Sequence, residues 1–456
     1  MHKASPPSFR NHRGNLTEGR IRDHLIRLSV PMIWGILAII SFQLVDTYYI
    51  SLLGTGPLAA ISFTFPVTMT IFSLIIGLGI GMSSVLSRRI GAGEYHDVVR
   101  IATHGLILAA LIALGLTVLG LLVMDPLFKV MGADDIMMPM IRDYMTLWFV
   151  GIIFITIPVV GNSAMRASGD TLNPALNMMF AAIFNAILAP FLVFGLAGFP
   201  RMEIQGAALA TVISYILAMG LSLYVLRVHK NLLLRGGMEW ARFGDSAKAV
   251  LTVGLPAGIA ALIQPLTQGI ITGIMATYGT QAVAAFGVAT RVEAMAFVII
   301  MALATGMSPI LGQNHGAARP ERVRETLRLS LSFCVGWSFF IAIVLGLFAT
   351  KIAAAFSQDP VVIHYAALYF WIVPFSYAFG NLVQGWSSAL NAMGEPKRSA
   401  LMIIIKMIAL QIPAAFLGGH LLGAAGVFVS IAAINIITGI YYHSLHWRNL
   451  PKVQRA

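Results

Sequence analysis

The sequence has 456 residues, of which 58% are hydrophobic and only 11% are charged. Because soluble domains carry about 25% charged residues, this composition excludes an ordinary soluble protein and indicates a protein embedded in lipid. The formal net charge of +12 would suit a nucleic-acid partner, but the cations lie in alternate loops between apolar segments, so we expect no nucleic-acid partner.

Residues 1–29 are basic and polar, and we predict a cytoplasmic segment there. The apolar stretch that follows is too long for a signal-peptide core and lacks a clear cleavage site. Apolar stretches of about 20 residues can each cross about 30 Å of hydrocarbon as a helix. We therefore predict an all-α polytopic membrane protein with twelve transmembrane helices, at about 30–53, 57–86, 98–124, 136–164, 174–195, 205–226, 249–278, 282–311, 327–350, 361–390, 400–418 and 421–443.

The chain contains an internal repeat, because residues 54–176 return, shifted by 225 positions, as residues 279–401. Gly54 and Thr55 match Gly279 and Thr280, for example. Such a repeat predicts two pseudo-symmetric lobes of six helices, which could expose a site between them to either side of the membrane by rocking. The predicted parts are an N-lobe (30–228), a cytoplasmic linker (229–248), a C-lobe (249–447) and a cytoplasmic tail (448–456).

Lysine and arginine residues gather in alternate loops, and the other loops hold only a few, such as Lys129, Arg142, Arg201 and Lys351. Positively charged loops stay in the cytoplasm, so both termini are predicted to be cytoplasmic. We expect a multi-pass monomer in the plasma membrane, or in the inner membrane if the source is Gram-negative.

Asp46 is the first ionisable residue within a predicted span. A charged side chain at mid-bilayer costs at least about 2.5 to 3.5 kcal/mol of insertion free energy, so a carboxylate at this position indicates a functional role. The repeat provides an internal control: Asp46 corresponds to Ile271, although the surrounding glycines recur. This asymmetry favours a task specific to the N-lobe over a carboxylate that merely packs.

Among the ionisable residues of the C-lobe spans, Glu293, Arg291 and Lys406 lie more than one turn from a span end. Glu293 falls near mid-depth of the eighth span, and Arg291 precedes it by two residues, so the two do not share a helix face. We expect Arg291 either to pair with a carboxylate on another helix or to join Glu293 in a cavity. Lys406 lies one to two turns into the eleventh span and could extend its ammonium to the cytoplasmic face.

Polar side chains at similar depths could line a substrate cavity, with Met and aromatic residues as its walls. A protonatable Asp46 in a partly wet cavity lets a proton and a cationic ligand compete for one site, which would couple H⁺ entry to cation export. Sodium could replace the proton if oxygen atoms of Asp46, Asn185 and Thr211 converge. The cavity candidates are Gln43, Asn177, Gln264, Gln268, Arg291, Glu293, Tyr377 and Gln384.

Three motifs together resemble the multidrug and toxic compound extrusion family over nearly the whole chain. They are Val45-Asp46-Thr47, the run from Arg166 to Thr171 after the fourth span, and the run from Gly312 to Ala317 after the eighth. The resemblance implies two six-helix lobes, a central cleft, and export of organic cations or other toxic compounds driven by H⁺ or Na⁺. It implies that Asp46, Asn185 and Thr211 form the ion site of a DinF-like branch.

Two departures from the family pattern weaken the sodium alternative. The DinF-like branch has a second acid where this chain has Ala189, and the NorM-like branch has a Glu where this chain has Gln264. Both ion sites are therefore incomplete, which favours protons.

We predict a secondary antiporter that exports small-molecule drugs or organic cations, without a cofactor or an enzymatic activity. Two alternatives stay open. A lipid-linked oligosaccharide flippase of the same wider superfamily would need a strongly cationic cavity. A membrane-embedded enzyme would need clustered carboxylates, a His-rich metal motif or a Ser/His pair at bilayer depth.

Overall fold

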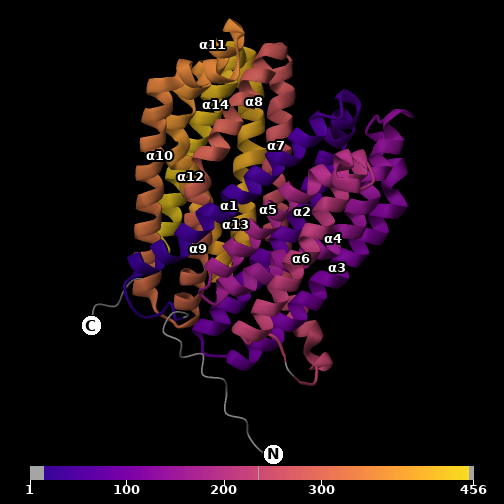
Figure 1. Ribbon diagram of the computed structural model, residues 1–456. Coiled ribbons are helices and arrows are strands. Elements are labelled where there is room, and N and C mark those ends of the chain that lie inside the picture. The colour runs from indigo at the N-terminus through magenta and orange to yellow at the C-terminus, as the bar shows by residue number, and fades with distance from the viewer. Residues whose placement is uncertain (1–14, 235, 451–456) are drawn as a thin grey trace, which may run out of the picture.

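The computed structural model describes residues 15–234 and 236–450, which form helices and no strand (Figure 1). The first half contains α1 (Ile21–Ser51), α2 (Thr55–Gly91), α3 (Tyr95–Val130), α4 (Met137–Ala167), α5 (Leu172–Phe194) and α6 (Glu203–Tyr224). The second half contains α7 (Phe243–Ala276), α8 (Thr280–Ala296), α9 (Val298–Gly316), α10 (Pro320–Phe356), α11 (Pro360–Ile372), α12 (Tyr377–Met393), α13 (Pro396–Ile404), the π-helix η5 (Ile405–Gln411) and α14 (Ile412–Arg448).

The helices can cross a membrane twelve times. Within the described residues, ten helical stretches are long and apolar enough to span, and α8 with α9 adds an eleventh that bends by 44°. The stretch 396–448 is one of the ten, but its backbone breaks at Leu422 and Gly423. A Cβ on Gly418 would lie 2.4 Å from the carbonyl oxygen of Gly426, so the chain doubles back there and crosses twice. The twelve-helix prediction is therefore confirmed.

Several predicted boundaries are wrong by a few residues to two turns. The first helix begins at Ile21 rather than residue 30, because the charged turn that contains Arg22 and Asp23 continues the apolar helix. α7 begins at Phe243, within the predicted linker. The predicted tenth span is divided into α11 and α12 by a 3₁₀ turn at Pro374–Ser376, because proline leaves a backbone carbonyl unpaired. The rest of the predicted N-terminal segment (1–14) and of the tail (451–456) lies outside the described residues.

Reciprocal contacts between α2 and α9 reveal the pseudo-twofold relation of the two halves. A Cβ on Gly91 would lie 1.9 Å from the carbonyl oxygen of Gln313, and one on Gly316 would lie 2.0 Å from that of Arg88. The 225-residue shift relates Gly91 to Gly316 and Arg88 to Gln313. Each half therefore contributes the same glycine to the contact, which only a residue without a side chain can make.

A second pair of close helix crossings extends this seam. Gly77 and Gly81 of α2 pack against Gly254 and Gly258 of α7, and the equivalent glycine of α9, Gly306, packs against Ser29 of α1. These positions lie toward the end of the bundle where α1 begins and α14 ends, which we call the base. In Figure 1 the two groups of helices meet toward the base and diverge above it.

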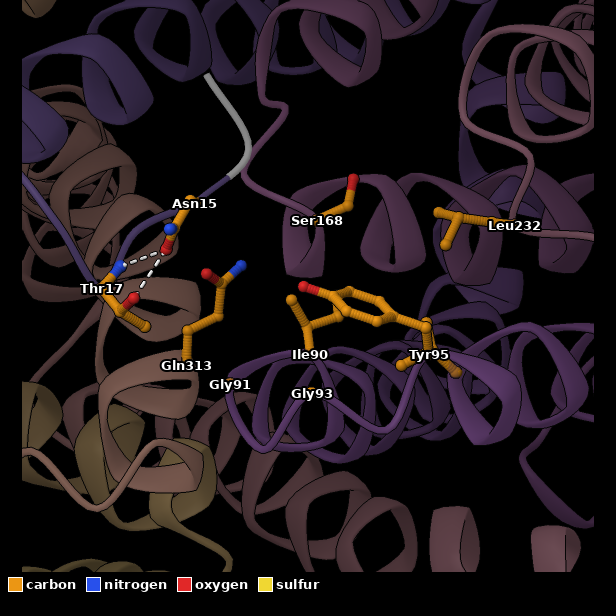
Figure 2. Close-up of a pocket in the computed structure, with 10 residues that line it drawn as sticks. Asn15, Thr17, Ile90, Gly91, Gly93, Tyr95, Ser168, Leu232 and Gln313 are labelled. Atoms are coloured by element: carbon orange, nitrogen blue, oxygen red, sulfur yellow. Dashed lines mark hydrogen bonds between the residues drawn. The ribbon is translucent and has the colours of Figure 1, made fainter. Parts of the chain in front are cut away.

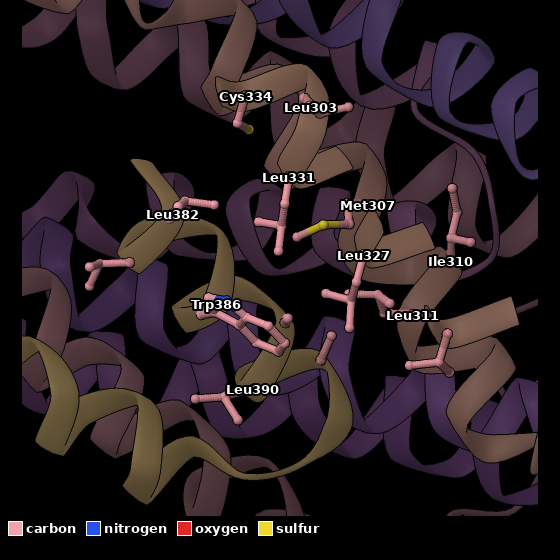
Figure 3. Close-up of a cluster of buried hydrophobic side chains, with 14 of the residues drawn as sticks. Leu303, Met307, Ile310, Leu311, Leu327, Leu331, Cys334, Leu382, Trp386 and Leu390 are labelled. Carbon is pink, nitrogen blue, oxygen red and sulfur yellow. The ribbon is translucent and has the colours of Figure 1, made fainter. Parts of the chain in front are cut away.

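The C-lobe has a large apolar core beside this seam. Trp386 of α12 is fully buried among Leu327 and Leu331 of α10 and Met307 of α9 (Figure 3). Cys334 of α10 lies in the same cluster and is 5% exposed. This packing joins α9, α10 and α12 into one rigid unit. It therefore holds α9 in place where its glycines contact the N-lobe.

Residues 15–20 precede α1 and form a short segment, the strap, that covers the base on the C-lobe side. Leu16 is fully buried, and its backbone N–H donates to Gln313 Oε1 at 3.0 Å while its carbonyl accepts from Asn314 Nδ2 at 3.0 Å. Gln313 Nε2 also donates to the carbonyl of Ala167 in the N-lobe at 2.8 Å. Arg322 donates to the carbonyl of Gly19 at 2.9 Å. The motif from Gly312 to Ala317 therefore ties the strap to both lobes.

A cavity of about 150 Å³ lies beside the strap (Figure 2). Asn15 and Thr17 of the strap, Tyr95 of α3 and Gln313 of α9 are among its lining residues. Leu16 anchors the strap in the apolar core of the C-lobe, and hydrogen bonds to Gln313, Asn314 and Arg322 hold its backbone.

The motif from Arg166 to Thr171 anchors the linker to the N-lobe. Asp170 Oδ2 lies 2.7 Å from Lys230 Nζ and accepts from Asn173 Nδ2 at 2.6 Å. Burial alone would raise the pKa of Asp170, but the Lys230 ammonium and the Asn173 hydrogen bonds outweigh it and hold that pKa below its ordinary value. The carboxylate therefore stays charged at neutral pH and fixes the linker.

Candidate ion and substrate sites in the two lobes

Asp46 lies in the far half of α1, with one carboxylate oxygen enclosed. It is 25 residues beyond Ile21, which at 1.5 Å per residue places it about 37 Å along the helix. Its Oδ1 is buried and has no hydrogen-bond partner among the described residues. The phenol of the buried Tyr144 of α4 lies close enough to Asp46 to interact with it electrostatically. An enclosed carboxylate oxygen without a partner favours a bound proton or cation.

The structure joins two of the three predicted ion-site residues. Asn185 of α5 is fully buried, and its Nδ2 donates to Thr211 Oγ1 of α6 at 3.2 Å. Asn185 Oδ1 is also enclosed without a partner. Tyr49, one turn beyond Asp46, donates to the carbonyl of Ala186, which follows Asn185, so α1 and α5 are adjacent at this level. No hydrogen bond connects Asp46 itself to Asn185 or Thr211 within the described residues.

The other polar candidates of the N-lobe have different surroundings. Asn177 is 2% exposed, and its Nδ2 donates to Asn162 Oδ1 at 3.1 Å and to the carbonyl of Ala218 at 3.2 Å. These contacts give Asn177 a role in holding α4, α5 and α6 together. Gln43, one turn before Asp46, is exposed.

In the C-lobe, Glu293 lies at the centre of an aromatic cluster. Tyr369 Oη of α11 donates to Glu293 Oε2 at 2.5 Å. Tyr377 is 2% exposed, its hydroxyl has no hydrogen-bond partner among the described residues, and its ring packs at 4.7 Å edge-to-face on Phe297. Phe297 marks the 44° bend between α8 and α9, so the carboxylate lies beside this bend.

Lys406 is buried within the C-lobe, so the expectation that its ammonium reaches the cytoplasmic face is wrong. The residue is 5% exposed, and its ammonium lies close enough to the Glu293 carboxylate to interact with it electrostatically. The π-helix η5 carries Lys406, and its wider turn changes which residues of this helix face inward.

The remaining C-lobe candidates have exposed side chains. Arg291 is exposed and makes no ion pair with a described residue, so the prediction of a buried pair for it is wrong. Gln264, Gln268 and Gln384 are also exposed. Sequence reasoning missed Tyr369 and Tyr144, whose only signal was a hydroxyl-bearing aromatic residue within an apolar span.

Known proteins match this chain over nearly its whole length. The MatE family profile matches residues 31–191 and 256–417, one stretch in each half. A FAD transporter of Shewanella oneidensis is 38% identical over 92% of this chain and 93% of its own length. The probable multidrug resistance protein YpnP of Bacillus subtilis is 24% identical over 95% of this chain and 97% of its own length.

Solved structures give the same result. The MATE transporter VcmN of Vibrio cholerae in its bent form superposes with a TM-score of 0.89 at 28% identity, over 94% of this chain and 97% of that one. These matches exclude the membrane-embedded enzyme, because the proteins of this family are transporters. The profile matches most of both lobes, and the architecture agrees with that of the solved transporters. The chain therefore belongs to the MatE family of multidrug and toxic compound extrusion transporters.

Proposed function

We propose that this transporter is a secondary active antiporter that exports amphipathic small molecules in exchange for protons. The observation that carries the proposal is the enclosed, unpartnered oxygen of Asp46 in the far half of α1. A proton bound there removes the cost of a buried negative charge, so protonation and substrate binding can be mutually exclusive.

The proposed cycle uses the two lobes as rigid bodies. In the state described here the glycine seam and the strap hold the base closed. We propose that the protein lies in the plasma membrane, or in the inner membrane of a Gram-negative cell, with both termini in the cytoplasm. The end of the bundle opposite the base then faces outward. Asp46 takes up a proton in this state, the seam opens, and the inward-facing protein exchanges the proton for substrate.

Protons are the proposed coupling ion rather than sodium. Sodium would need several converging oxygen atoms, and among the described residues no hydrogen bond joins Asp46 to Asn185 or Thr211, which bond to each other. The buried Ala189 provides no second acid. A lone carboxylate suffices for a proton.

The substrate has two candidate classes. Organic cations or other toxic amphipathic compounds are the first candidate, because a cation can pair with the acidic Asp46 and because several relatives are named multidrug resistance or export proteins. FAD is the second candidate, favoured by the sequence identity of 38% to the FAD transporter of S. oneidensis.

Transport by purified protein in proteoliposomes tests the proposal. Ethidium and FAD are loaded separately, and pH and sodium gradients are imposed one at a time. We expect an inward-directed proton gradient to drive at least one of the two probes, and an equal sodium gradient to drive neither. Flux that ignores both gradients would contradict antiport, and flux driven only by sodium would contradict the coupling ion.

A further inference from the structure

Lys406 is a cation in the C-lobe for which the antiport cycle has no use. The residue is 5% exposed, yet no hydrogen bond or ion pair to a described residue satisfies its ammonium. The small exposed part of the residue includes its ammonium nitrogen Nζ. A lysine inside a membrane span with its charge open to accessible space is a strong sign of a ligand site.

The surroundings of Lys406 are polar on one side and apolar on the other. Glu293 lies within electrostatic range but not within 4.0 Å, and its Oε2 already accepts from Tyr369. Gln411, five residues further along the π-helix, has an enclosed Oε1 without a partner. Residues five apart in a π-helix occupy neighbouring positions of one face, so η5 presents an ammonium and an amide together. A structural ion pair would instead have brought Lys406 and Glu293 into contact.

We propose that Lys406 binds an acidic group, a phosphate or carboxylate, of the transported molecule. This inference rests on the proposed function, because it assigns a substrate class to the same transporter. The ring of Phe297, which is half-buried beside Glu293, provides a surface for a planar ring system. An aromatic compound with an acidic group, such as a flavin nucleotide, satisfies both features, whereas a simple organic cation leaves the ammonium unpaired.

Binding measurements with two flavins test this assignment. FAD and riboflavin share the same ring system, but only FAD carries phosphates. Binding of each to purified protein in lipid nanodiscs is followed by quenching of flavin fluorescence. We expect the wild-type protein to bind FAD more tightly than riboflavin, and Lys406→Gln to weaken FAD binding by about ten- to a hundredfold, as for the loss of a charged hydrogen bond. Riboflavin binding is expected to change by less than about twofold on the same scale.

Two matched variants complete the test. Lys397→Gln removes an exposed lysine from the start of α13 and is expected to leave both affinities unchanged. Lys406→Arg keeps the positive charge and is expected to retain the preference for FAD, which decides the matter if Lys406→Gln does not fold. The inference is overturned if the wild type shows no preference for FAD, if Lys406→Gln weakens both flavins equally, or if Lys406→Arg folds and loses the preference.

The result is separable from that of the transport assay. Proton-driven ethidium flux together with FAD binding that ignores Lys406 would overturn the subsite and leave the antiport intact. Lys406-dependent FAD binding without any gradient-driven flux would do the reverse.

Discussion

Replacing Asp46 with asparagine is expected to reduce proton-driven efflux by more than about tenfold, to the background of vesicles without protein. Asparagine has nearly the same shape but cannot bind and release a proton at physiological pH, so the exchange has no coupling group. The measurement is the rate of ethidium or FAD efflux at equal protein content, with a pH gradient imposed.

Asp143→Asn is the matched control. Asp143 is an exposed residue of α4 without an ion pair among the described residues, and its replacement is expected to leave efflux unchanged. Undiminished efflux by Asp46→Asn would remove Asp46 from the transport cycle. Equal losses in both variants would point to a general charge effect.

Replacing Gly91 with alanine is the second change with a large expected effect. The added Cβ would lie 1.9 Å from the carbonyl oxygen of Gln313, so the backbones of α2 and α9 must move apart. Because the base-closed state alone contains this contact, the substitution shifts the population toward the base-open state. We expect efflux to fall by more than about tenfold, since a shift of 1.4 kcal/mol already changes a population ratio tenfold.

The pseudo-symmetric variant Gly316→Ala tests the same contact from the other lobe. Its Cβ would lie 2.0 Å from the carbonyl oxygen of Arg88, so a similar loss is expected. Gly220→Ala is the control, because nothing lies within 4 Å of a Cβ at that exposed position of α6. Size-exclusion chromatography separates trapping from misfolding. Wild-type efflux by monodisperse Gly91→Ala would show that the seam is not a moving gate.

The sequence predicted the two-lobed architecture because its signals are strong ones. Apolar stretches of membrane-spanning length are hard to mistake, and the 225-residue repeat fixes the relation of the halves. Gly77 and Gly81 lie at a close approach of two helices. Their partner α7 could not be inferred, because apolar periodicity does not tell which helix of the other lobe a given face meets.

The site was only partly predictable for reasons of local geometry. Asp46, Asn185 and Thr211 stood out as polar residues in apolar spans, and Asn185 does bond to Thr211. The interior position of Lys406 depends on a π-helix, and no residue pattern in 405–411 signals the wider turn. The strap was missed because Leu16 is a single apolar residue in a basic segment, and its burial depends on distant Gln313.

The central claim is that the Asp46 carboxyl group exchanges a proton for substrate. Proton release on binding of the cation ethidium measures this directly, with purified protein in weakly buffered solution and a pH-indicator dye. The account predicts release of about one proton per wild-type molecule and none from Asp46→Asn. Equal proton release by the two proteins would contradict it.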